Sequence, residues 1–112
     1  MTWHTPMKQM LPRDLAARLR DSKDPPLLLD VREPWEFGIC RIDGARSLPM
    51  RQIPAALGEL DRDRELVVIC HHGIRSQQVA AYLDYQGFRN VINLQGGVAA
   101  WARDVDPAMP TY

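Results

Sequence analysis

The sequence predicts an α/β fold in three layers, with a small parallel sheet flanked by helices on both faces. Two observations support this prediction. Runs rich in apolar residues at 27–31, 66–69 and 91–94 are short, which is typical of strands that are buried on both faces. Segments with helical spacing alternate with these runs, and such alternation favours a parallel sheet covered by helices.

Length and composition indicate one globular domain over residues 1–112, with an irregular tail over residues 104–112. Hydrophobic residues make up 46% and charged residues 25% of the chain, which argues against a disordered or fibrous protein. The 14 basic and 14 acidic side chains balance, so no net charge favours a nucleic-acid partner. No apolar run approaches the roughly 20 residues of a membrane helix, and no membrane partner is expected.

The two cysteines, Cys40 and Cys70, are too few for a disulfide framework. The N-terminus lacks the pattern of a signal peptide, so we expect reduced thiols and a cytoplasmic protein. The neighbours of Cys40 predict a packed, structural thiol. A second role, as a thiol that forms a disulfide with Cys70, stays open because the sequence does not place the two sulfur atoms.

The N-terminal half is predicted to contain two helices and two strands. Leu11, Leu15 and Leu19 recur every four residues and therefore line one face of the first helix. Pro12 suits the first turn of that helix. The elements that follow are a break at 24–26, a strand at 27–31, a second strand at 45–48, an amphipathic helix at 53–60 and a charged turn at 61–65.

The C-terminal half begins with the clearest strand, residues 66–69, which leads through segment 70–76 into a helix. Gly87 lies where a left-handed residue ends that helix, and Phe88 is positioned to pack back on Leu83. The remaining elements are a strand at 91–94, a turn at 96–97 and a helix at 98–103.

Cys70 lies where the chain passes from a buried strand into a helix. In open parallel sheets, ligand sites gather at this carboxyl end of the strands. Unpaired N–H groups and the dipole at the helix start favour an anion, so a cysteine there is expected to exist largely as thiolate. Gly73 allows a tight turn, Arg75 adds a positive charge, and Ser76 supplies a hydroxyl donor. These features predict that Cys70 is a nucleophile.

Four further polar residues are expected near this loop. Asp30 and Arg32 end the first buried strand at the same edge of the sheet, and we expect them to brace the loop by hydrogen bonds. His71 and His72 are expected to shape the pocket. A zinc site is not favoured, because no second cluster of Cys and His completes four ligands.

Three ordered segments give the chain a specific resemblance to a known family. Over nearly its whole length the chain resembles the rhodanese-like sulfurtransferases in their single-domain form, which implies a rhodanese-like three-layer fold. At Arg41 the sequence departs from the family, in which many members have histidine. The matching segments are 30–33 with 42–45 and 48–49 for the N-terminal signature, 70–76 for the active-site loop, and 94–98 with Trp101 for the C-terminal signature.

The resemblance implies a two-step sulfur transfer through Cys70. The thiol would take a sulfane sulfur from thiosulfate or a similar small-molecule donor and become a persulfide. Cyanide or a thiol would then accept the sulfur, and neither a metal nor an organic cofactor is implied. The loop residues implied to bind substrate are His71, His72, Gly73, Ile74, Arg75 and Ser76, with Asp30 and Arg32 in support.

Other functions stay open. The chain could instead be a sulfur-carrier or interaction module that a protein donor loads and a protein acceptor unloads. A cysteine-dependent phosphatase or arsenate reductase is less favoured, because those enzymes place five residues between Cys and Arg, and here only four separate Cys70 from Arg75. A catalytically inactive regulatory domain is the weakest interpretation, since such domains often lack the cysteine.

Overall fold

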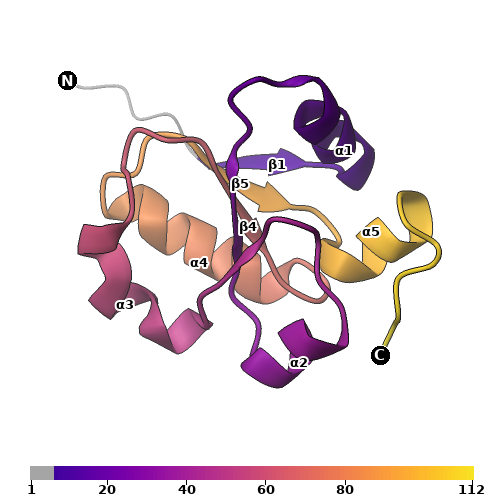
Figure 1. The fold of residues 1–112 in the computed structure, drawn as a ribbon. Helices are drawn as coiled ribbons and strands as arrows, with labels where there is room; N and C mark the ends of the chain where they lie inside the picture. Colours follow the sequence, from indigo (N-terminus) through magenta and orange to yellow (C-terminus); the bar gives the residue numbers. More distant parts are fainter. Residues whose placement is uncertain (1–6) are drawn as a thin grey trace.

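The computed structural model describes residues 7–112, and at its centre lies a five-stranded sheet (Figure 1). The spatial order is β1-β5-β4-β2-β3, and every neighbouring pair is parallel. The predicted α/β class with a parallel sheet is therefore confirmed. The strands are β1 (Lys8–Met10), β2 (Leu27–Asp30), β3 (Arg46–Ser47), β4 (Leu66–Ile69) and β5 (Val91–Leu94).

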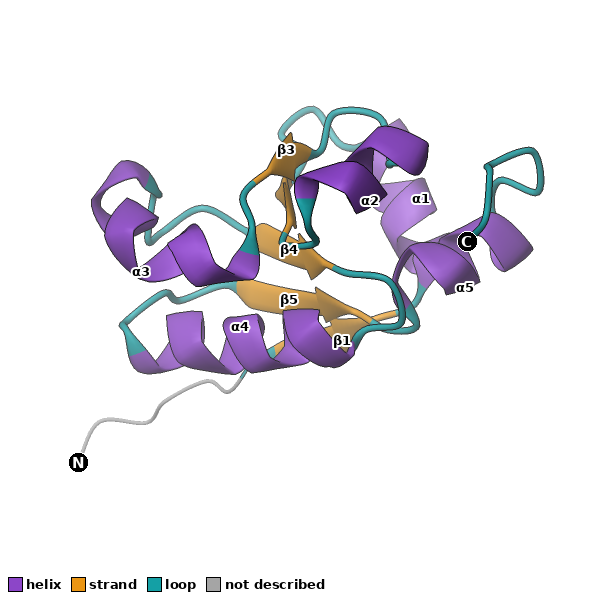
Figure 2. Cartoon of the chain, turned by 90° about the horizontal axis from the view of Figure 1, so that it is seen from below, coloured by secondary structure: helices purple, strands orange, loops and turns teal. Residues whose placement is uncertain are grey.

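Helices cover both faces of the sheet, as Figure 2 shows. On one face, helices α1 (Pro12–Asp21) and α5 (Gly97–Asp104) contribute to one apolar cluster. On the other face, α3 (Ile53–Ala56) and α4 (Ile74–Tyr85) contribute to a second cluster. A further short helix is α2 (Pro34–Ile39). Within residues 7–112, no helix has both the length and the apolar character needed to cross a bilayer.

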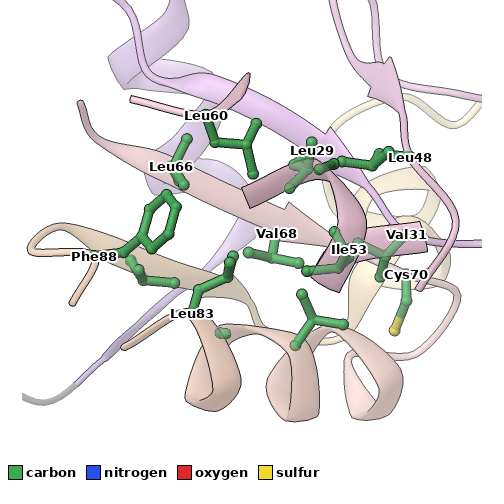
Figure 3. Close-up of a cluster of buried hydrophobic side chains, with 14 residues drawn as sticks. Leu29, Val31, Leu48, Ile53, Leu60, Leu66, Val68, Cys70, Leu83 and Phe88 are labelled. Atoms are coloured by element: carbon green, nitrogen blue, oxygen red, sulfur yellow. The ribbon is translucent and has the colours of Figure 1, made fainter. Parts of the chain in front are cut away.

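Strand β4 shows why the sheet is buried on both sides. Its alternate residues point to opposite faces, so Leu66 and Val68 enter the cluster beneath α3 and α4, whereas Val67 and Ile69 enter the cluster beneath α1 and α5. All four side chains are fully buried. Figure 3 shows the cluster beneath α3 and α4, with Cys70 near Val31 and Ile53, away from the Phe88 end. Because Cys70 directly follows the last residue of β4, it lies at the carboxyl edge of the sheet.

The predicted end of helix α4 is also confirmed. Gly87 adopts a left-handed φ of 94°, and the Phe88 N–H donates to the Leu83 carbonyl at 3.1 Å. Phe88 and Leu83 are both fully buried in the same cluster.

Four elements differ from the expectations. Strand β1 and helix α2 were not predicted, because Lys8–Met10 is a short and partly polar edge strand and α2 has only six residues. The helix expected at 53–60 is instead the four-residue α3 between 3₁₀ turns at Met50–Gln52 and Leu57–Glu59. Leu11 caps α1 from outside and is 53% exposed, so only Leu15 of the predicted stripe is fully buried.

The start of helix α5 packs directly against the loop that follows β4. The Val98 N–H donates to the Cys70 carbonyl at 2.9 Å, and the Ala99 N–H donates to the His71 carbonyl at 3.0 Å. Gly97, with φ of 59°, permits this approach, because a Cβ there would overlap both carbonyl oxygens. The first turn of α5 is therefore the support on which the Cys70 loop rests.

We expect Gly97→Ala to lower the free energy of unfolding by about 3 kcal/mol, since it combines a left-handed backbone with overlap against rigid backbone atoms. Urea unfolding measures this loss. Gly38→Ala is the matched control, because a Cβ at Gly38 meets no atom within 4 Å and alanine is favoured in a helix. Equal stability of the two variants would contradict this account of the α5 contact.

Candidate active site

Cys70 lies directly after β4, and its side chain is nearly enclosed, with the residue 1% exposed. Its Sγ accepts a hydrogen bond from the Gly73 N–H at 3.0 Å and lies 3.2 Å from the Ser76 hydroxyl oxygen. Within the described part of the chain, these two groups are the only hydrogen-bond donors recorded at this sulfur. Both donors belong to the loop and the first turn of α4, so the sulfur lies at a helix start, where an anion is favoured.

The loop owes its shape to close backbone packing. Gly73 has a left-handed φ of 93°, and a Cβ there would lie 3.0 Å from the Gly96 nitrogen. Beneath it, α5 binds the carbonyls of Cys70 and His71, as described above. The loop carbonyls thus point toward α5, and the Gly73 N–H points toward the sulfur. A side chain at either Gly73 or Gly97 would disturb this arrangement.

Arg75 is paired with Glu36 of helix α2, a partner that the sequence reasoning missed. Its two terminal nitrogens donate to the two carboxylate oxygens at 2.6 and 2.8 Å. The Glu36 side chain is 5% exposed, and the Arg75 side chain is 37% exposed. The bonds from Arg75 lower the pKa of Glu36 to about 2, against the opposing effect of burial. Because Glu36 balances its charge, Arg75 does not offer the loop an uncompensated cation.

Tyr112 packs over the loop from the C-terminal segment. Its ring stacks on His71 with centroids 4.0 Å apart, and His71 stacks in turn on His72 at 4.0 Å. The Tyr112 hydroxyl donates to Glu36 at 2.8 Å, and burial raises the pKa of Tyr112 to about 12. Burial and the neighbouring His72 lower the pKa of His71. Of the other loop residues, Ile74 is exposed.

Asp30 and Arg32 form a fully buried ion pair with a shortest distance of 2.7 Å. Burial opposes the charge of Arg32, but hydrogen bonds with Asp30 and Tyr112 outweigh it and raise the Arg32 pKa. Arg32 also donates to the carbonyls of Glu36 and Cys40, and to the Tyr112 hydroxyl at 2.8 Å. None of the side-chain bonds of this pair ends on residues 70–76, and Arg32 reaches the loop only through Tyr112, whose ring stacks on His71. The pair thus holds α2 and Tyr112, because a buried charge must satisfy its donors locally.

Cys40 and Cys70 are both free thiols and belong to apolar clusters on opposite faces of the sheet. Cys40 packs with the α1 and α5 side, where its Sγ lies 3.8 Å from an Arg32 nitrogen. Across residues 7–112, no group of three or more His, Cys, Asp or Glu side chains is arranged to hold a metal ion.

Two of the missed residues left a signal in the sequence. Glu33 and Glu36 form a reciprocal capping box at the start of α2, and an acidic residue three positions after a helix start is its usual sign. Asn93 interrupts an otherwise apolar strand, and its side chain bonds to Ser76 and to the Gly73 carbonyl. Tyr112 left no such sign, because its contacts lie far away in the sequence.

The Glu36–Arg75 pair predicts a pH-dependent contribution to stability. Because the Glu36 pKa is about 2 in the folded protein and 4.5 in its reference state, the contribution is complete above about pH 4.5 and is lost as the pH falls toward 2. We expect Glu36→Gln to lower the free energy of unfolding by about 2 kcal/mol near neutral pH and by much less in acid. Urea unfolding across this pH range gives the difference.

Glu59→Gln serves as the control for this experiment, because Glu59 is an exposed partner of Arg46 at 3.6 Å. This variant should follow the wild-type pH dependence, since exposed ion pairs contribute little. The assigned role of the Glu36–Arg75 pair would be refuted if the free energies of unfolding of the wild type and of Glu36→Gln differed by the same amount at neutral and at acidic pH.

Comparisons with known proteins agree with this geometry. The rhodanese-like domain model matches residues 11–104, which run from α1 through α5. A sulfurtransferase of Allochromatium vinosum is 46% identical over 89 residues, covering 80% of this chain and 82% of the relative. The thiosulfate sulfurtransferase GlpE of Shewanella oneidensis is 45% identical over 74 residues, covering 66% of this chain and 73% of the relative.

A solved structure and a longer relative complete the comparison. The crystal structure of a rhodanese-like domain protein from Staphylococcus aureus superposes with a TM-score of 0.81 at 30% identity, covering 95% of this chain and 99% of that one. An adenylyltransferase and sulfurtransferase of Zea mays is 36% identical over 102 residues, and the chain spans only 21% of its length. The chain therefore belongs to the rhodanese-like domain family, among relatives that are named sulfurtransferases.

Proposed function

We propose that this protein transfers a sulfane sulfur from thiosulfate, or a similar donor, to cyanide or a thiol through a persulfide on Cys70. The observation that carries the proposal is the sulfur of Cys70, which accepts a hydrogen bond from the Gly73 N–H at the start of a helix. Such a position favours a thiolate, and the thiolate is the nucleophilic form of cysteine. The name of the Shewanella oneidensis relative supports thiosulfate as the donor.

In the first step, the Cys70 thiolate attacks the outer sulfur of thiosulfate. A bond forms between Sγ and that sulfur, and the bond to the sulfonate sulfur breaks. Sulfite leaves with the electron pair, and the negative charge moves from Sγ to the outer sulfur of the persulfide. In the second step, cyanide or a thiolate attacks the outer sulfur, thiocyanate or a new persulfide leaves, and Cys70 returns as thiolate.

The remaining loop residues have supporting roles in this proposal. Gly73 and Ser76 hold Sγ, and His71, His72 and Ile74 are assigned to substrate binding as members of the same loop. Arg75 adds positive electrostatic potential beside the loop, and its pairing with Glu36 reduces that potential. The short Cys70–Arg75 loop and the enclosed thiol favour a donor that presents a single sulfur atom over a bulky phosphoryl group. The cytoplasmic location expected from the sequence is kept as part of this proposal.

We expect Cys70→Ser to abolish thiocyanate formation from thiosulfate and cyanide, because a hydroxyl does not form a persulfide. Cys40→Ser is the matched control and should retain turnover, since Cys40 packs on the opposite face of the sheet from Cys70. Colorimetric detection of thiocyanate gives both rates. Unchanged turnover in Cys70→Ser, with folding checked by circular dichroism, would exclude the proposed mechanism.

A second candidate is a sulfur carrier that receives its sulfur from a protein. It is favoured by exposed apolar side chains beside the loop: Ile74 is 69% exposed, and Trp35 on α2 is 64% exposed and packs edge-on to Tyr112. Exposed aromatic and aliphatic side chains around a site are common at protein interfaces. The Zea mays relative, named an adenylyltransferase and sulfurtransferase, contains such a domain within a longer chain.

The two candidates differ in their sulfur source. If the carrier function dominates, a cysteine desulfurase with cysteine should load Cys70 faster than thiosulfate does, and Trp35→Ala on α2, outside the loop, should slow only the protein-dependent loading. Persulfide formation followed by mass spectrometry separates the two. Loading by thiosulfate alone, with none from the desulfurase, would eliminate the carrier function.

A further inference from the structure

Asn93 is a buried polar residue that lies behind the Cys70 loop without touching the sulfur. It is 1% exposed and occupies the third position of β5, next to Val68 in β4. Its side chain makes three hydrogen bonds, to the Ser76 hydroxyl at 2.5 Å, to the Gly73 carbonyl at 3.3 Å and to the Gln9 side chain at 2.9 Å. Ser76 and Gly73 are the two residues that also bond to Cys70 Sγ.

The orientation of the Asn93 amide follows from these partners. A backbone carbonyl only accepts hydrogen bonds, so the Asn93 nitrogen must face the Gly73 carbonyl. The amide oxygen therefore faces Ser76, and it only accepts. Ser76 must then be the donor in the bond to Asn93.

This arrangement gives the single hydroxyl hydrogen of Ser76 two competing acceptors. One is the Asn93 oxygen at 2.5 Å, and the other is Cys70 Sγ at 3.2 Å. When Sγ carries a negative charge, the hydrogen turns toward sulfur, because a bond to a charged acceptor is the stronger one. When Sγ is uncharged, as in the thiol or in the inner sulfur of a persulfide, the hydrogen turns toward Asn93.

We propose that Asn93 is a positioning residue that accepts the Ser76 hydrogen whenever Cys70 Sγ is uncharged. Asn93 thereby stabilises the thiol and the persulfide relative to the free thiolate. The persulfide part of this inference rests on the proposed function, because charge leaves Sγ when the outer sulfur is bound. Asn93 thus lowers the tendency of the loaded enzyme to give up its sulfur to any acceptor.

The hydrogen bond from Asn93 to the Gly73 carbonyl does not obscure the effect of Asn93 on Ser76. The Gly73 carbonyl also accepts the N–H of Gln77 in the first turn of α4 at 3.3 Å. Removing the Asn93 amide therefore leaves the Gly73 turn held by the helix. The change that remains is the loss of the alternative acceptor for Ser76.

The test uses Asn93→Leu, which keeps the branched shape and the number of heavy atoms of the side chain and removes both polar atoms. The pH dependence of alkylation of Cys70 by iodoacetamide is measured in the Cys40→Ser background. On the acidic limb, where the rate follows the thiolate fraction, we expect Asn93→Leu to react about threefold to tenfold faster than its parent. On the alkaline plateau it should react slightly more slowly, because a better stabilised thiolate is a weaker nucleophile.

Two comparisons isolate the route through Ser76. In a Ser76→Ala background, Asn93→Leu should change the acidic limb less than about twofold, because the competing hydrogen is absent. Gln9→Leu removes the third Asn93 bond but none of the loop contacts, and its profile should match the parent. The proposal would be overturned if Asn93→Leu reacted more slowly than its parent on the acidic limb, or at the same rate. It would also be overturned if Asn93→Leu had the same effect in the Ser76→Ala background as it has when Ser76 is present. Asn93→Val, which suits a strand, replaces Asn93→Leu if that variant does not fold.

The persulfide is tested separately. A Cys70 persulfide in Asn93→Leu should pass its sulfur to cyanide about threefold to tenfold faster than in the parent, because thiolate Sγ is the leaving group. If the parent fails to load from thiosulfate, only the proposed transfer from thiosulfate is refuted. The alkylation experiment needs no sulfur donor and therefore still decides the role of Asn93.

Discussion

The contact between the first turn of α5 and the carbonyls of Cys70 and His71 is the interaction on which the site depends. It directs two loop carbonyls toward α5 and satisfies N–H groups that a helix start leaves unpaired. Parallel pairing of β4 with β5 brings the loop and α5 to the same edge of the sheet. Gly97 then permits backbone contact that no other residue would allow. The Gly73 N–H is consequently left to face the sulfur.

Charge at the site is arranged in pairs. Glu36 binds Arg75 from α2, and Tyr112 joins Glu36 to Arg32, whose own charge is balanced by Asp30. Two buried carboxylates and two guanidinium groups thus neutralise one another. In the proposed mechanism, an anionic sulfur would therefore be stabilised by the Gly73 N–H, the Ser76 O–H and the start of α4 rather than by a free cation.

The sequence reasoning worked where the physical signal was local. The buried strands at 66–69 and 91–94, the end of α4 at Gly87 and the position of Cys70 after a strand all depend on neighbouring residues. The partners of Arg75 and Arg32 were not predictable, because Glu36 and Tyr112 lie 39 and 80 positions away along the chain. Strand β1 was missed because an edge strand needs little apolar character.

The measurement that most directly tests the account is intact mass spectrometry of the protein after treatment with thiosulfate, followed by peptide mapping. The account predicts a gain of one sulfur atom, located on the peptide that contains Cys70 and removed by cyanide. A protein that gains no sulfur from thiosulfate or from a protein donor, or that carries it on Cys40, would contradict the central claim that the loop after β4 is built to hold a persulfide.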